Sequence, residues 1–266
     1  MMNPPLCDQC SCFRALLTFL SIARALLTFL CHTGAMTATP TGARARARAQ
    51  TIEDLKRVAR QHLATDGADL SLRSVARELG MVSSAVYRYF DSRDALLTAL
   101  IIDAYDDLGE TVEAAEAAVR RTDLRGRWLA TCHAVRDWSR AHRAEYALLY
   151  GTPVPGYVAP QDTIGPASRP VLVMSAILRD AIERGLLAPA AHERLPAPVR
   201  ADLSGIIALP GFEGLSPALL ARGMNSWAAV FGLVSFELFG RLTNAIFDDD
   251  AWLDYQLRLI THQLGL

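Results

Sequence analysis

Residues 71–93 place two short helical patterns on either side of one glycine turn, and this stretch constrains the fold more than any other part of the chain. In the first pattern, apolar residues recur with the spacing of one helix face: Leu72, Val75, Ala76 and Leu79. Ser71 suits the N-cap of that helix, and Gly80 stands where a helix leaves through a left-handed conformation. The pattern predicts a short helix that ends in a sharp turn.

A second short helix is expected after the turn, capped by Ser83 and carrying Val86 and Phe90 on its inner side. Two short helices joined in this way predict a helix-turn-helix, although an ordinary helical hairpin would show a similar pattern. In a helix-turn-helix the second helix lies in the major groove of DNA. Its free face here offers small polar groups, a phenol and a cation: Ser83, Ser84, Tyr87 and Arg88.

The residues on either side of the motif resemble those of a known protein family. Residues 51–97 closely resemble the N-terminal domain of TetR-type transcriptional regulators. The elements follow in the same order: an amphipathic helix at 51–66, the motif, and the segment Ser92-Arg93-Asp94-Ala95-Leu96-Leu97. Arg93 stands where the family usually has Lys, and both can hold a phosphate. Residues 227–232 (WAAVFG) resemble, more weakly, the Trp-containing (WHG-type) helix of one TetR C-terminal subgroup, which often has His at the position of Phe231.

The resemblance implies that this domain binds double-stranded DNA. Arg73 matches a base-contacting position, and an Arg can bond guanine O6 and N7 together. Tyr87 and Tyr89 match positions that contact the DNA backbone and thymine methyls. Helix N-termini and cations favour phosphate. The expected DNA-binding residues are Arg46, Arg48, Ser71, Arg73, Ser83, Ser84, Tyr87, Arg88, Tyr89 and Arg93.

Charge is near balance, with 27 basic and 28 acidic residues, but it is unevenly spread. Residues 36–94 hold 10 basic and 7 acidic groups, whereas residues 95–266 hold 15 and 20. A basic head and an acidic body fit a head that meets phosphate. Within this head, residues 36–50 alternate Ala with Arg44, Arg46 and Arg48, which we interpret as a flexible basic arm or a solvated linker.

Residues 1–35 repeat the heptapeptide RALLTFL, at 14–20 and again at 24–30, a spacing of ten that suits no helical or strand period. Arg24 interrupts the apolar run that a signal or membrane anchor needs. The cysteines at 7, 10 and 12 lack a second pair at zinc-finger spacing, so no metal site is expected. We favour an upstream extension with Met36 as the natural start, and a disordered or membrane-touching tail is the alternative.

The rest of the chain predicts an all-α protein. A three-helix helix-turn-helix domain at 51–97 is expected to precede a helical-bundle body at 98–266 that binds a ligand and dimerises. Expected body elements are a long helix from Ser92 to about 120, two helices within 123–150, a loop at 151–160, and helices at 167–186, 197–207, 217–242 and 248–264. The helix at 217–242 is apolar nearly all round, so we expect a homodimer through it and the helix at 167–186.

Aromatic and apolar residues of the body predict a ligand pocket: Trp128, Cys132, Trp138, Tyr146, Tyr150, Met174, Trp227 and Phe231. No inward-facing cation is evident, so the expected ligand is uncharged and largely apolar or aromatic. The resemblance implies that this ligand releases the protein from a near-palindromic operator. A ligand-independent DNA-binding regulator or architectural protein is the alternative. No catalytic constellation or cofactor motif is found, so we expect a cytoplasmic regulator and no enzyme.

Overall fold

The computed structural model describes residues 42–66, 70–187 and 194–266. Regular structure in these residues is helical, which confirms the all-α prediction. The elements are α2 (Ala43–Asp66), α3 (Leu72–Glu78), the 3-10 helix η1 (Val86–Arg88), α4 (Arg93–Ala117), α5 (Leu124–Ala141), α6 (Arg143–Tyr150), the 3-10 helix η2 (Gln161–Thr163), α7 (Ile164–Glu183), α8 (Ala197–Ile207), α9 (Pro217–Leu238) and α10 (Asp249–Leu264). The extension at 1–35 lies outside the described residues.

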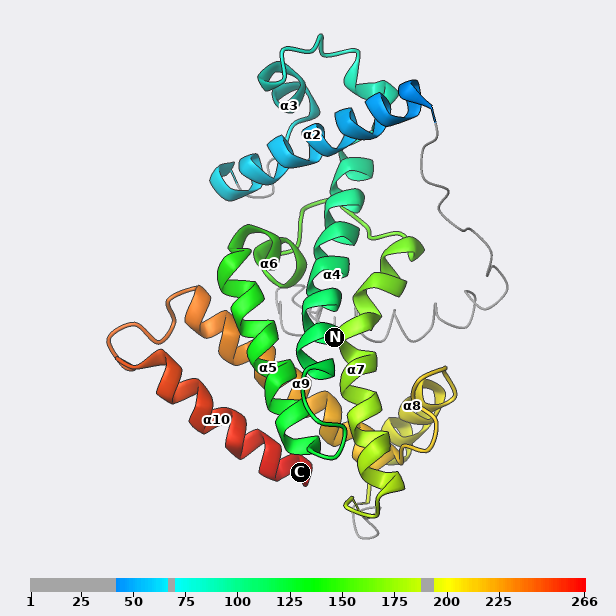
Figure 1. Cartoon of the computed structure of the whole chain (residues 1–266), viewed down its shortest axis with the longest axis vertical. Coiled ribbons are helices and arrows are strands. Elements are labelled where there is room, and N and C mark those ends of the chain that lie inside the picture. The colour runs from blue at the N-terminus through cyan, green and yellow to red at the C-terminus, as the bar shows by residue number, and fades with distance from the viewer. Residues whose placement is uncertain (1–41, 67–69, 188–193) are drawn as a thin grey trace, which may run out of the picture.

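A small head, made of α2, α3, η1 and the start of α4, stands at one end of the molecule (Figure 1). Its core gathers the apolar stripe of the motif with residues of α2 and α4: Leu55, Val58, Ala59, Val75, Ala76, Val86, Phe90, Leu96, Leu97 and Leu100. Helix α4 then continues from the head into the body, as Figure 1 shows. One continuous helix therefore joins the two parts.

The first helix and turn of the motif form as expected. Gly80 has a φ of +67°, the left-handed conformation that its position requires. The amide of Met81 donates to the carbonyl of Ala76 at 2.9 Å, and the amide of Gly80 donates to that of Arg77 at 3.0 Å, which closes the end of α3. Ser92 caps α4, since its hydroxyl accepts from the amide of Ala95 at 3.0 Å.

The second helix of the motif is shorter than predicted. Ser83 does not cap it, because residues 83–85 form a turn and the regular part begins only at Val86, as the 3-10 helix η1. Serine and aromatic residues are weak helix formers, and they make up most of this segment. A full α-helix is therefore not favoured here. Burial of Val86 and Phe90, 0% and 7% exposed, anchors the segment in place of regular helical hydrogen bonds.

The flexible arm predicted at 36–50 is wrong for residues 43–50, while residues 36–41 lie outside the described ones. Helix α2 begins at Ala43, eight residues before the predicted start. The physical reason is that Ala and Arg are both strong helix formers, so their alternation extends a helix that has already nucleated. The Arg residues of 43–48 are therefore held on a helix.

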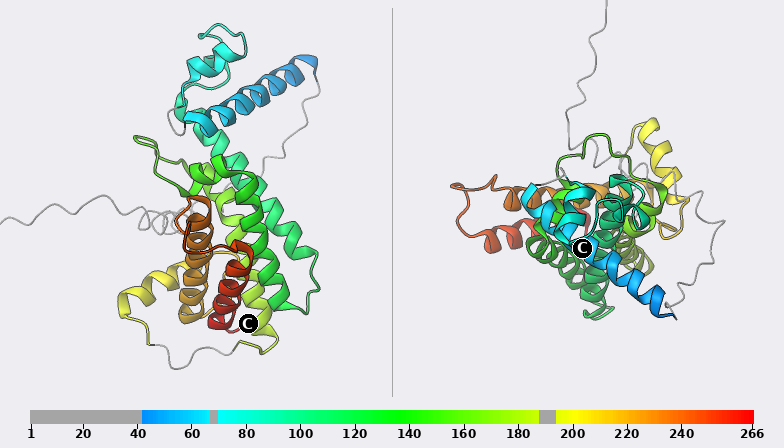
Figure 2. Two further views of the ribbon diagram at one scale, coloured as in Figure 1. Left: turned by 90° about the vertical axis from the view of Figure 1, so that its left-hand side faces the viewer. Right: turned by 90° about the horizontal axis from the view of Figure 1, so that it is seen from above.

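The body packs α4 between α5 and α7, with α9 and α10 completing the bundle and α8 resting mainly on α9 (Figures 1 and 2). The break predicted near His142 separates α5 from α6. Asp248 caps α10 by accepting from the amide of Ala251 at 2.9 Å, as its position before an acidic first turn suggests. Two of these helices end earlier than predicted, α7 at Glu183 and α9 at Leu238.

The body also touches the head away from α4. Val154, in the loop after α6, is part of the head core, and Ala144 and Leu148 of α6 pack against it. The phenol of Tyr157 lies 2.9 Å from the hydroxyl of Thr98 on α4. Helix α6 and its following loop therefore form a second mechanical connection between body and head.

Among the described helices, none is long and apolar enough to cross a membrane.

Candidate DNA-binding surface and interior cavity

Five of the ten predicted DNA-binding residues are exposed on α3, the turn and η1. Arg73 is exposed on α3, and the exposed side chains of the turn and η1 are Ser83, Ser84, Tyr87 and Arg88. The sequence reasoning missed Arg77, which is also exposed on α3, one turn after Arg73. The i, i+4 spacing of these two arginines was the available signal, because such residues share a helix face.

Two predicted DNA-binding residues, Arg48 and Tyr89, contact each other beside the motif. The Nη1 of Arg48 donates to the carbonyl of Arg88 at 2.9 Å, and its guanidinium lies 5.1 Å from the ring centroid of Tyr89. Side-chain hydrogen bonds, first with Thr51 and then with Arg88, lower the pKa of Tyr89. Arg48 therefore ties α2 to the end of η1, and both Arg46 and Arg48 are exposed on α2.

The remaining two candidates lie at helix starts. Ser71 precedes α3 and is exposed, and its hydroxyl makes no capping bond within the chain. The Nε of Arg93 donates to the carbonyl of Leu70 at 3.1 Å, so this guanidinium already holds the entry to α3 against the start of α4. Its contact with phosphate stays a prediction.

A cavity of about 30 Å³, partly open to the surface, lies in the body between α5, α7, α9 and residues 212–215. Its lining is almost wholly apolar: Trp128, Val171, Met174, Ser175, Leu178, Phe212, Leu215, Leu220, Gly223, Met224 and Trp227. This volume exceeds the roughly 10–15 Å³ that a cavity needs to hold one water molecule. In this conformation the cavity is therefore a small apolar pocket that an aromatic compound would have to enlarge.

Of the eight pocket residues expected from the sequence, the structure brings only Trp128, Met174 and Trp227 to this cavity. The other five belong to the packed core beside it. Cys132 is 1% exposed, and burial raises the pKa of its thiol. The indole of Trp138 donates to Asp107 at 2.6 Å.

Tyr146, Tyr150 and Phe231 form an aromatic cluster in that core. The hydroxyl of Tyr146 donates to the carbonyl of Phe231 at 3.0 Å, and burial raises its pKa to about 12. The ring of Phe231 lies 4.4 Å from that of Tyr150 and 4.3 Å from that of Trp227 (centroid to centroid). The cluster thus joins the cavity wall to α6, which touches the head. Phe212 and Leu215 line the cavity although their segment lacks clear periodicity, so the sequence offered little signal for them.

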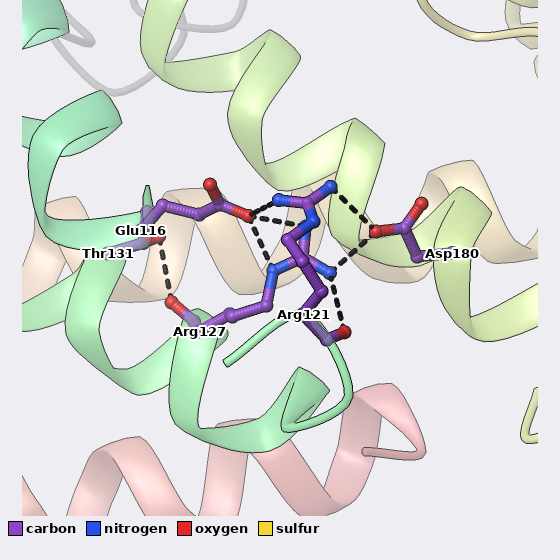
Figure 3. A network of polar contacts seen from close by, with 5 residues as sticks. All are labelled: Glu116, Arg121, Arg127, Thr131 and Asp180. Carbon is purple, nitrogen blue, oxygen red and sulfur yellow. Dashed lines mark hydrogen bonds and ion pairs between the residues drawn. The ribbon is translucent and has the colours of Figure 1, made fainter. Parts of the chain in front are cut away.

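The expectation that no cation points inward is wrong. Arg127 is completely buried, with Glu116 at the end of α4 and Asp180 on α7 on either side of it (Figure 3). Its Nε donates to Glu116 at 2.5 Å and its Nη1 to Asp180 at 2.6 Å. Arg121 bridges the same two carboxylates from outside, at 2.6 and 3.0 Å. Hydrophobic periodicity does not reveal such a residue, because only tertiary packing brings the two acidic partners to it.

Known proteins share this architecture. A family model described as "Bacterial regulatory proteins, tetR family" matches residues 56–100, and one described as "Tetracyclin repressor-like, C-terminal domain" matches residues 128–260, which include the segment at 227–232. The HTH-type transcriptional regulators Rv1816 of Mycobacterium tuberculosis and Mb1846 of Mycobacterium bovis are each 40% identical over 230 residues, covering 84% of this chain and 96% of the relative.

The chain belongs to the TetR family of bacterial transcriptional regulators. The crystal structure of the regulatory protein SCO4313 is 31% identical with a TM-score of 0.67 and covers 82% of this chain and 98% of the other. The TetR-family regulator PfmR of Thermus thermophilus, 15% identical with a TM-score of 0.51, covers 78% of this chain and 97% of the other and shares the fold. This TetR-family protein is thus a DNA-binding transcription regulator, and its head carries the helix-turn-helix.

Within the described residues, no group of three metal-binding side chains is found.

Proposed function

We propose that this TetR-family regulator is a cytoplasmic, non-enzymatic repressor that a small, largely apolar molecule releases from a near-palindromic operator. The observation that carries the proposal is the position of the apolar cavity. Its lining comes from α5, α7 and α9, and α5 and α7 are the helices that flank α4. A ligand that enlarges the cavity would move the neighbours of the one helix that runs into the head. Such a ligand can shift the DNA-binding equilibrium only as far as it prefers the released conformer.

A second route supports the same coupling. Trp227 lines the cavity, and its ring contacts Phe231, which contacts Tyr150 on α6. Helix α6 and the loop after it pack against the head core through Leu148 and Val154. Movement at Trp227 can therefore reach the head without passing through α4.

We propose that α9 and α10 form the dimer surface. The contribution of residues 167–186 stays a prediction: α7 packs against α4, α5 and α9, and the exposed large apolar side chain of this range is Leu186, after the end of the helix. By contrast, α9 and its C-cap expose a stripe made of Ala228, Gly232, Phe236 and Phe239, and the neighbouring α10 exposes Tyr255 and Leu259. A second copy of this chain suits the stripe, because one motif reads only a few base pairs and a two-fold dimer reads both halves of an operator.

Phe236→Glu is expected to convert the dimer into a monomer and to weaken operator binding by at least tenfold. The ring is 53% exposed here, and a carboxylate in a self-complementary interface would face its own copy across the two-fold axis. Analytical ultracentrifugation and a DNA titration measure the two effects. Val199→Glu, on the exposed face of α8, serves as the control and should change neither. A Phe236→Glu protein that stayed dimeric would exclude α9 as the interface.

The repressor function is tested by recovering and sequencing the fragments of genomic DNA that the protein retains. The recovered sites should contain a near-palindrome, and neutral apolar compounds should then be titrated against the protein–operator complex. Release of the operator by at least one compound supports the proposal. Tight binding that no such compound weakens would favour the alternative, a regulator that acts without a ligand.

A further inference from the structure

The second half of the helix-turn-helix, residues 82–91, is fixed to the head core at two points only. These points are Val86 and Phe90, which are the buried residues of this recognition segment. Residues 87–89 lie between them, and Tyr87 and Arg88 are exposed. Because η1 is a short 3-10 helix that no further helical turn follows directly, its last carbonyls lack helical partners. The conformation of residues 87–89 therefore depends on contacts from outside the segment.

Arg48 of α2 makes such a contact. Its Nη1 donates to the carbonyl of Arg88 at 2.9 Å, and its guanidinium lies 5.1 Å from the ring centroid of Tyr89. No main-chain amide among the described residues donates to this carbonyl, so Arg48 is its partner within the chain. A planar guanidinium can donate a hydrogen bond in its plane and lie against an aromatic ring at the same time. One side chain thus holds two successive residues of the recognition segment.

Thr51, about one turn further along α2, contacts the same place. Its side chain shares a hydrogen bond with that of Tyr89. Residues three apart lie on one face of a helix, so Arg48 and Thr51 reach the segment from the same face of α2. This face includes Arg48 because α2 begins at Ala43, whereas a helix that began at Thr51 would leave Arg48 outside it. The early start of α2 therefore has a structural consequence for the motif.

We propose that Arg48 is a positioning residue for operator recognition. It holds residues 87–89 in the conformation that presents Tyr87 and Arg88 to DNA, and it acts through this segment instead of through a phosphate. The free protein then meets its operator with the segment already ordered, so DNA binding does not have to supply the free energy of ordering it. The inference concerns the operator alone and does not depend on the proposed release by a ligand.

The test measures Arg48→Ala on two DNA duplexes of equal length, an operator recovered from genomic DNA and a non-specific sequence, at several salt concentrations. Affinity for the operator should fall by about fivefold for each half-site, the equivalent of one net hydrogen bond. Affinity for the non-specific duplex and the salt dependence on both should change little, because a cation that binds no phosphate displaces no counterion. Alanine is a strong helix former, so α2 itself should persist in the variant.

Hydrogen exchange of the free protein gives a second readout that needs no DNA. The amides of residues 88–90 donate to carbonyls within the segment, so loss of Arg48 should speed their exchange severalfold. The amide of Met81, which closes α3 by donating to the carbonyl of Ala76, should exchange as in the wild type. Mass spectrometry resolved over these two stretches separates a local loss of order from a general loss of stability, which would speed exchange at both.

Arg46→Ala is the matched variant, since it removes one cation from the exposed start of the same helix. The side chain of Arg46 bonds to no group in the part of the chain that the structure describes. Exchange at residues 88–90 should therefore stay unchanged in Arg46→Ala. Its titrations on the two duplexes give the effect of removing a charge alone, against which Arg48→Ala is compared.

Three results would overturn the proposal. Equal weakening on both duplexes with a shallower salt slope would make Arg48 a phosphate contact. Unchanged operator affinity would remove its role in recognition, and a loss of affinity without faster exchange at 88–90 would show that the segment is ordered without Arg48. None of these results bears on the ligand-responsive function, because release of the operator by a compound is measured on the wild-type complex.

Discussion

Replacement of Arg127 by Met is expected to lower the free energy of unfolding by about 3 kcal/mol, the lower end of the range for breaking a buried ion pair. Arg127 is 0% exposed, and its removal leaves the carboxylates of Glu116 and Asp180 facing one another without their buried cation. Arg121 still reaches both of them from the surface, so the loss should stay at that lower end.

Urea unfolding followed by Trp fluorescence measures this loss. Arg125→Met, an exposed position on the same helix, is the matched control and should change stability by no more than about 0.5 kcal/mol. The triple variant Glu116→Gln, Arg127→Met and Asp180→Asn should recover part of the loss, because it removes the uncompensated charges. An Arg127→Met protein within about 1 kcal/mol of the wild type would show that the network contributes little to stability.

Arg73→Ala is expected to weaken binding to the specific operator by about 1–3 kcal/mol and to relax the preference at one base pair in each half-site. Arg73 is exposed at the start of α3, and Tyr87 and Arg88 of η1 are exposed as well. A bidentate bond to a guanine edge would be lost together with the discrimination that it supplies. Titrations against the operator and its single-base variants, at several salt concentrations, measure both effects.

Arg200→Ala, an exposed arginine on α8 in the body, is the control and should leave operator affinity unchanged. The salt dependence separates two roles for Arg73. Uniform weakening on all DNA, with a shallower salt slope, would make Arg73 a phosphate contact and contradict its assignment as a reader of bases.

In the head, local sequence patterns and tertiary contacts determine different features. Gly80 and the stripe from Leu72 to Leu79 predicted α3 and its turn correctly, since both signals depend on neighbours along the chain. The same local reasoning failed for Ser83, because Val86 and Phe90 are fixed by burial against α2 and α4. It also missed the extension of α2 over residues 43–50, where Arg48 bonds to the carbonyl of Arg88, 40 residues away.

In the body, the apolar and glycine-punctuated patterns by themselves determined the all-α class, the break at His142 and the cap at Asp248. Only the tertiary structure decided which aromatic residues surround a cavity and which fill the core, and it alone placed Arg127 between two carboxylates. The physical reason is that helix periodicity and caps arise from residues a few positions apart, whereas a cavity or a buried ion pair requires residues from three helices to meet.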